Sequence, residues 1–180
     1  MTLTIATLIP AILLLVLGGG LASGHSLVTA TLKSLPRSQR AAYVFFGVGA
    51  AWFLHTVWHL SEADFGNFST QLFIGFGAVA LLSFKFVPDF LAVRGLCVLT
   101  LLGANPLLAA AYLEHYEQPQ RLFMVTVVYL AVALAIYLGA SPFRLRDFFE
   151  WLFRIPGRAR VVGGVLAAYG LLLVGVAFTY

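Results

Sequence analysis

The chain has 180 residues, of which 61% are hydrophobic and 10% are charged, and its formal net charge at pH 7 is +4. A soluble domain carries about 25% charged residues to keep its surface wetted, so this composition excludes a soluble globular protein. The basic residues lie in short segments between apolar runs, which excludes nucleic-acid binding. The single cysteine, Cys97, excludes an intramolecular disulfide and a multi-cysteine zinc or iron–sulfur site.

Six apolar runs have the length of membrane-spanning helices, which need about 20 apolar residues to cross about 30 Å of hydrocarbon. Lipid permits only helices or a closed barrel, and these runs lack the alternation of barrel strands. We therefore predict an all-α membrane protein, a single polytopic domain over residues 1–180 that forms a bundle of about six transmembrane helices. The predicted spans lie near residues 3–27, 41–60, 70–86, 90–113, 122–139 and 161–178.

The longest polar connection, "SPFRLRDFFEWLFRIPGRAR", predicts a short helix near residues 142–155. Ser141 and Pro142 are a suitable helix start, and Pro156–Gly157 is a stop signal. Aromatic residues flanked by arginines are typical of an amphipathic helix that lies in the lipid headgroup layer. Alternatively, the same aromatic surface docks a partner subunit.

The basic residues predict the orientation of the chain. They follow the first, third and fifth spans, whereas residues 61–68 and 114–120 between the other spans contain none. Because lysine and arginine stay on the cytoplasmic side, we expect both ends of the chain on the outer side of a bacterial cytoplasmic (inner) membrane. The residues concerned are Lys33, Arg37, Arg40, Lys85, Arg94, Arg144, Arg146, Arg154, Arg158 and Arg160.

The segment "AWFLHTVWHLSEADF" ends the second predicted span and contains two histidines four residues apart. On a helix, His55, His59 and Glu62 share one face. The next outer segment adds Glu114 and His115 at the same predicted depth. Imidazole and carboxylate bind zinc, iron, manganese or copper, so we predict a metal site formed by some of His55, His59, Glu62, Glu114 and His115.

Two other interpretations of these histidines remain open. A haem b needs axial histidines, commonly from two helices, and His55 or His59 can pair with His115 for this purpose. Histidines near a helix end are also common as plain interfacial residues, hydrogen-bonded to a neighbour or a lipid headgroup.

Three functional hypotheses follow from this sequence. The first is a membrane subunit or enzyme that holds a metal or haem near the outer face. The second is a transport component that binds a small molecule or ion within the bundle. Asn105 and Pro106 in the middle of the fourth span form either a packed kink or part of a midplane binding site, since broken helices at this depth bind substrate in transporters. The third is an assembly subunit of a larger membrane complex, surrounded by lipid, that docks other subunits or a second copy of itself through glycine-rich helix faces.

Overall fold

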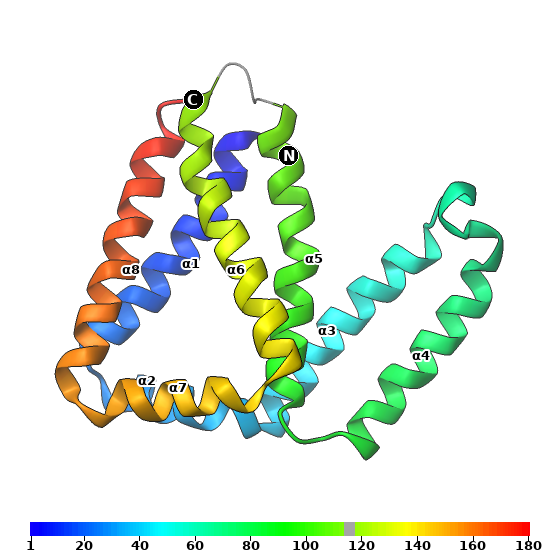
Figure 1. The fold of residues 1–180 in the computed structure, drawn as a ribbon, viewed down its shortest axis with the longest axis horizontal. Coiled ribbons are helices and arrows are strands. Elements are labelled where there is room, and N and C mark those ends of the chain that lie inside the picture. The colour runs from blue at the N-terminus through cyan, green and yellow to red at the C-terminus, as the bar shows by residue number, and fades with distance from the viewer. Residues whose placement is uncertain (114–117) are drawn as a thin grey trace. The chain divides into compact units, whose positions relative to one another are not determined.

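The computed structural model describes residues 1–113 and 118–180, apart from the side chains of Glu62, Leu113 and Pro156. This part of the chain is all-α, as predicted, with eight α-helices and four short 3-10 helices (Figure 1). The α-helices are α1 (Leu3–Ser23), α2 (Ser26–Ser34), α3 (Gln39–Trp58), α4 (Ser69–Phe86), α5 (Leu91–Leu113), α6 (Leu122–Ala140), α7 (Phe143–Arg154) and α8 (Pro156–Ala177). The 3-10 helices are η1 (Leu35–Arg37), η2 (Glu62–Asp64), η3 (Gly66–Phe68) and η4 (Pro119–Arg121).

Six of these helices, α1, α3, α4, α5, α6 and α8, are long and apolar enough to cross a membrane. This confirms the predicted number of helices of spanning length, and it is consistent with an integral membrane protein. The described chain divides into two compact units. Unit 1 comprises Met1–Lys33, Gly103–Leu134 and Arg146–Tyr180, and unit 2 comprises Ser34–Leu102 and Ala135–Leu145.

Unit 1 is built on the close pairing of α1 with α8, which lie side by side (Figure 1). Gly18 and Gly163 face each other, and a Cβ atom built on Gly163 would lie 2.6 Å from the carbonyl oxygen of Gly18. Such small residues let two helix backbones approach closely. In lipid no hydrophobic force drives helices together, so their association depends on this close packing. Around this pair, the buried side chains of Met124 and Leu173 complete an apolar core.

Hydroxyl groups at one end of unit 1 are hydrogen-bonded within it. Thr7 is fully buried; its hydroxyl donates to the carbonyl of Leu3 at 3.0 Å and pairs with the Tyr180 hydroxyl at 3.2 Å. The Tyr169 hydroxyl donates to the carbonyl of Phe123 at 3.1 Å. Because an unsatisfied buried polar group is costly, these bonds fix α6 and the end of the chain against α1 and α8.

Unit 2 pairs α3 with α5 and with α4. A Cβ atom on Gly95 of α5 would collide with the backbone of Phe45 and Phe46, so only glycine permits the observed approach of α5 to α3. Edge-to-face aromatic pairs join α3 to α4, with ring centroids 5.1 Å apart for Phe53 and Phe76. A similar pair one turn nearer the start of α4, Trp58 with Phe73, has centroids 5.3 Å apart.

Two helix boundaries differ from the predicted ones by more than two residues. The first predicted span, residues 3–27, ends at Ser23, because Gly24 adopts a left-handed conformation (φ 62°) and α2 then begins as a separate helix. Pro156 is the first residue of α8 and not a stop before a later span, because a proline at the first helical position lacks only an N–H that has no helical partner. The helix predicted near residues 142–155 is α7.

Helix α5 runs without interruption through Pro106, and both Asn105 and Pro106 are exposed. Proline is tolerated inside membrane helices because neighbouring groups and small local adjustments satisfy the backbone carbonyl that it leaves free. Helix α5 is therefore continuous at this position.

Candidate metal centre

The histidine pair lies at the end of α3 in unit 2. His55 is in the last turn of the helix, and His59 is its C-terminal cap residue. Both side chains are exposed, and their rings lie against each other with centroids 4.4 Å apart and an angle of 30° between the ring planes. The predicted helical spacing of four residues thus brings the two imidazoles together.

A hydrogen bond fixes the orientation of the His59 ring. Its Nδ1 lies 2.8 Å from the backbone carbonyl oxygen of His55, one of the last carbonyls of α3. A carbonyl can only accept, so Nδ1–H is the donor, and in the neutral ring the lone pair is then on Nε2. Metal-binding histidines are commonly held in this way, with one nitrogen bonded to a carbonyl and the other left for the ion.

The spacing of the two rings can be compared with that of imidazoles on one ion. With metal–nitrogen bonds of about 2.0–2.1 Å, two imidazoles at adjacent positions about 90° apart have ring centroids about 4.5 Å apart, and at the tetrahedral angle about 5.2 Å apart. The observed separation of 4.4 Å is closer to the first of these values than to the second. Copper(II) takes tetragonal sites, and manganese and iron take six ligands.

The same comparison argues against the two histidines sharing a haem. Two axial imidazoles bind the iron from opposite faces, so their centroids are about 6.4 Å apart at similar bond lengths. The rings of His55 and His59 are closer together than this, and both residues lie at the end of one helix, so they cannot bind opposite faces of one haem. Only one of them can therefore bind a haem, with a second axial ligand from elsewhere, such as the predicted His115.

The loop after His59 is held by local bonds. The Ser61 hydroxyl donates to Asp64 Oδ2 at 2.9 Å, and the Gly66 N–H donates to the Ser61 carbonyl at 2.8 Å. A Cβ atom on Gly66 would lie 2.6 Å from that carbonyl oxygen, so only glycine fits. Gly66 was not predicted as part of this site; its position shortly after two candidate ligands was the signal available in the sequence.

The structure brings together His55 and His59 among the predicted ligands. Because α3 ends at Trp58, the helical face that they share does not extend to Glu62, whose backbone is in η2 and whose side chain lies outside the described part. Glu114 and His115 also lie outside the described residues. Within the described residues, no group of three histidine, cysteine, aspartate or glutamate side chains is arranged to hold a metal ion.

Comparison of the chain with protein-family models, with curated proteins and with solved structures gave no match.

Proposed function

We propose that this chain is an integral membrane protein that binds one divalent transition-metal ion at the end of α3 through His55 and His59. The observation that carries the proposal is the contact of the two imidazole rings, with centroids 4.4 Å apart, and the His59 ring oriented by the 2.8 Å contact of its Nδ1 with the His55 carbonyl. The negative end of the α3 dipole also favours a cation at this position.

Two imidazoles leave open positions on such an ion. The remaining ligands are then water, the predicted carboxylates Glu62 and Glu114, or the imidazole of His115. An ion that keeps an open position binds and activates a further small ligand, as catalytic metal sites do. This is the chemical basis for a membrane subunit or enzyme that acts at the surface of the bilayer.

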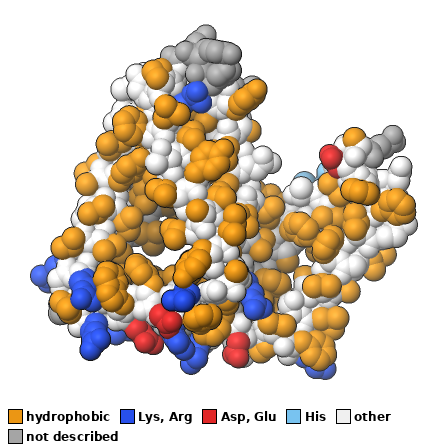
Figure 2. Space-filling view, in the orientation of Figure 1, with side chains coloured by type: hydrophobic (Ala, Val, Ile, Leu, Met, Phe, Trp, Pro, Cys, Tyr) orange, Lys and Arg blue, Asp and Glu red, His pale blue; other side chains and the backbone are white. Residues whose placement is uncertain are grey.

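Contact with lipid is supported by the apolar side chains that the helices expose. Within the spanning part of α4 no residue is buried, and Leu81 is 74% exposed. Val16 of α1 is 66% exposed. Figure 2 shows hydrophobic side chains along the helices of each unit. Exposure on this scale is unfavourable in water and favourable in hydrocarbon.

The orientation with both ends of the chain outside is supported by unit 1. Apart from Arg121, which donates to the Ala111 carbonyl near the other end of the unit, its basic side chains gather at the end where α2 and α7 lie, and both ends of the chain are at the opposite end (Figures 1 and 2). Helix α7 buries Leu152 and exposes Phe148 and Trp151, whose rings stack at 6.0 Å. An exposed aromatic face beside arginines suits a helix in the inner headgroup layer.

Cysteine labelling tests this orientation. In a Cys97→Ala background, we expect Thr179→Cys to react with a membrane-impermeant maleimide added to intact cells, because it lies at the outer end of α8. Arg154→Cys, at the end of α7, should react only after the cells are opened. Both positions are exposed, so accessibility to solvent is matched. Labelling of Arg154→Cys in intact cells together with protection of Thr179→Cys would reverse the assignment.

Metal analysis tests the site. We expect the purified protein to bind about one copper(II) ion per chain, because copper(II) heads the affinity order of divalent ions on nitrogen ligands. Its electron paramagnetic resonance spectrum should show coupling to two imidazole nitrogens. Absence of stoichiometric metal would exclude the proposed centre, and a Soret band in the absorption spectrum would assign the histidines to haem instead.

A further inference from the structure

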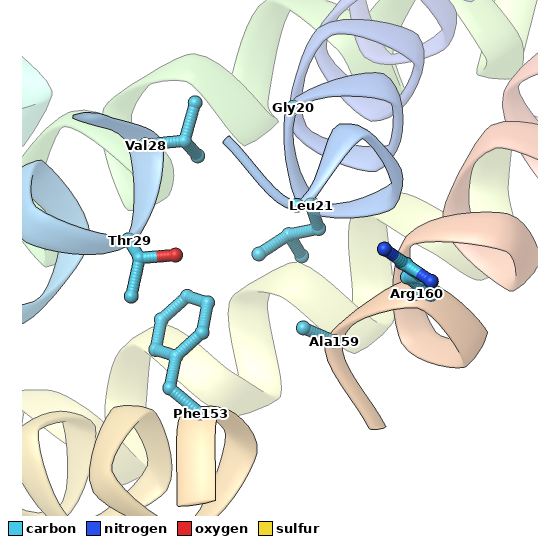
Figure 3. Close-up of a pocket in the computed structure, with 8 residues that line it drawn as sticks. Gly20, Leu21, Val28, Thr29, Phe153, Ala159 and Arg160 are labelled. Carbon is cyan, nitrogen blue, oxygen red and sulfur yellow. The ribbon is translucent and has the colours of Figure 1, made fainter. Parts of the chain in front are cut away.

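The end of unit 1 that carries α2 and α7 contains a cavity of about 240 Å³, shown in Figure 3. It lies at the turn where Gly24 separates α1 from α2, and its other side is formed by the end of α7 and the start of α8. Its volume is several times that needed by one water molecule, so it can admit a small polar group with some attached carbon.

The lining combines one cation with a hydroxyl and apolar side chains. Arg160 borders the cavity on one side and Thr29 on another; in this view Leu21 lies between them, Val28 above and Phe153 below (Figure 3). The guanidinium lies against the turn, with its Nε 3.6 Å from the position of a Cβ atom on Gly24. Among the described residues, Arg160 has no hydrogen-bond or ion-pair partner.

The surroundings of the cavity are positively charged. The two carboxylates of this part of unit 1, Asp147 and Glu150, lie 2.7 Å and 3.7 Å from Arg146 and are paired with it. Two further cations belong to the helices that form the cavity. Lys33 lies over the ring of Phe153, 5.7 Å from its centroid, and Arg158 lies over Trp151. An anion that enters the cavity therefore meets an arginine whose charge is not already neutralised.

We infer that this cavity binds the phosphate group of an anionic phospholipid through Arg160, with the glycerol and upper acyl carbons on Leu21, Val28 and Phe153. A phosphate and an adjoining apolar chain match the two halves of the lining. The position also matches, because the cavity lies at the ends of α1 and α8, where the headgroups of the bilayer meet spanning helices. Basic pockets between helix ends on the cytoplasmic side are typical sites for anionic headgroups.

The test is lipid retention by the purified protein in native mass spectrometry. Phosphatidylglycerol should remain bound as one molecule per chain, and phosphatidylcholine with the same acyl chains should not. Arg160→Gln should weaken retention about five- to tenfold, the value of one basic contact with an anionic lipid. Arg154→Gln, which removes the same charge at the same end but does not line the cavity, is the matched control and should bind as the unmodified protein does.

Three results would overturn the inference. The first is equal retention of phosphatidylglycerol by Arg160→Gln and Arg154→Gln, and the second is equal retention of the two lipids by the unmodified protein. The third is that inorganic phosphate alone raises the melting temperature as much as phosphatidylglycerol does. The last result would assign the cavity to free phosphate and not to a lipid. A second variant, Val28→Phe, keeps the test decisive if Arg160→Gln does not fold. It fills the cavity and leaves the arginine in place, so it too should lower the retention of phosphatidylglycerol.

Discussion

Gly163→Ala is expected to lower the free energy of unfolding by about 1–3 kcal/mol, the usual cost of inserting a methyl group into a packed interface. The added Cβ atom would lie 2.6 Å from the backbone nitrogen of Ala22 and 2.6 Å from the carbonyl oxygen of Gly18. Both are backbone atoms, so α1 and α8 must move apart to accommodate it. Separation of the helices also costs dispersion contacts along both of them.

The neighbouring glycine supplies the control. A Cβ atom on Gly164 would have no atom within 4 Å, so Gly164→Ala should leave the melting temperature unchanged or raise it slightly. The same contrast occurs on α1, where Gly18 is packed against Ala167 and Gly19 is open. Thermal unfolding followed by size-exclusion chromatography in detergent compares the four variants. Equal effects within each pair would show that α1 and α8 do not pack as described.

The number of spanning helices could be predicted because hydrophobic length is a property of each run alone. The exact ends of these helices could not be predicted. A single residue, Gly24, ends α1 by taking a left-handed conformation, and the apolar residues after it then belong to α2. Pro156 similarly starts a helix or stops one depending on the residues around it, and here it starts α8.

Which glycines pack tightly could not be predicted either. Gly163 and Gly164 are adjacent and chemically identical, yet only one faces α1. Their difference depends on the rotation of α8 about its axis, which is set by tertiary contacts and not by the local sequence. The role of Arg160 could not be predicted for the same reason. In the sequence it is one of several basic residues that indicate orientation, and its cavity is formed by residues from four separate helices.

The histidine pair was predictable because its geometry is local. A spacing of four residues on a helix places two side chains on one face, and the ring contact of His55 with His59 follows from it. Glu62 was predicted on the same face because the helix was expected to continue to Leu60. The actual end at Trp58 starts a loop before Glu62, so a helical period no longer relates its position to that of the histidines.

His55→Ala and His59→Ala are each expected to reduce copper(II) affinity by more than about a hundredfold. Loss of a residue that only hydrogen-bonds to a metal ligand costs up to about a hundredfold, and loss of the ligand itself should cost more. Each variant removes one of the two imidazoles, so the paramagnetic spectrum should change from coupling with two nitrogens to coupling with one. The matched control is His25→Ala. His25 is also exposed at a helix end, where its Nδ1 accepts a hydrogen bond from the N–H of Leu27 at 3.3 Å.

The two variants should differ in stability, which separates ligand roles from structural ones. His55→Ala keeps the carbonyl to which His59 donates, so its melting temperature without metal should be unchanged. His59→Ala loses that hydrogen bond, whose net contribution is about 0.5–1.5 kcal/mol, and should melt earlier. Metal affinity that survives both substitutions, or that falls equally in His25→Ala, would contradict a centre at the end of α3. If His59→Ala lowers stability but still binds the metal, His59 acts only as the C-terminal cap of α3 and not as a ligand.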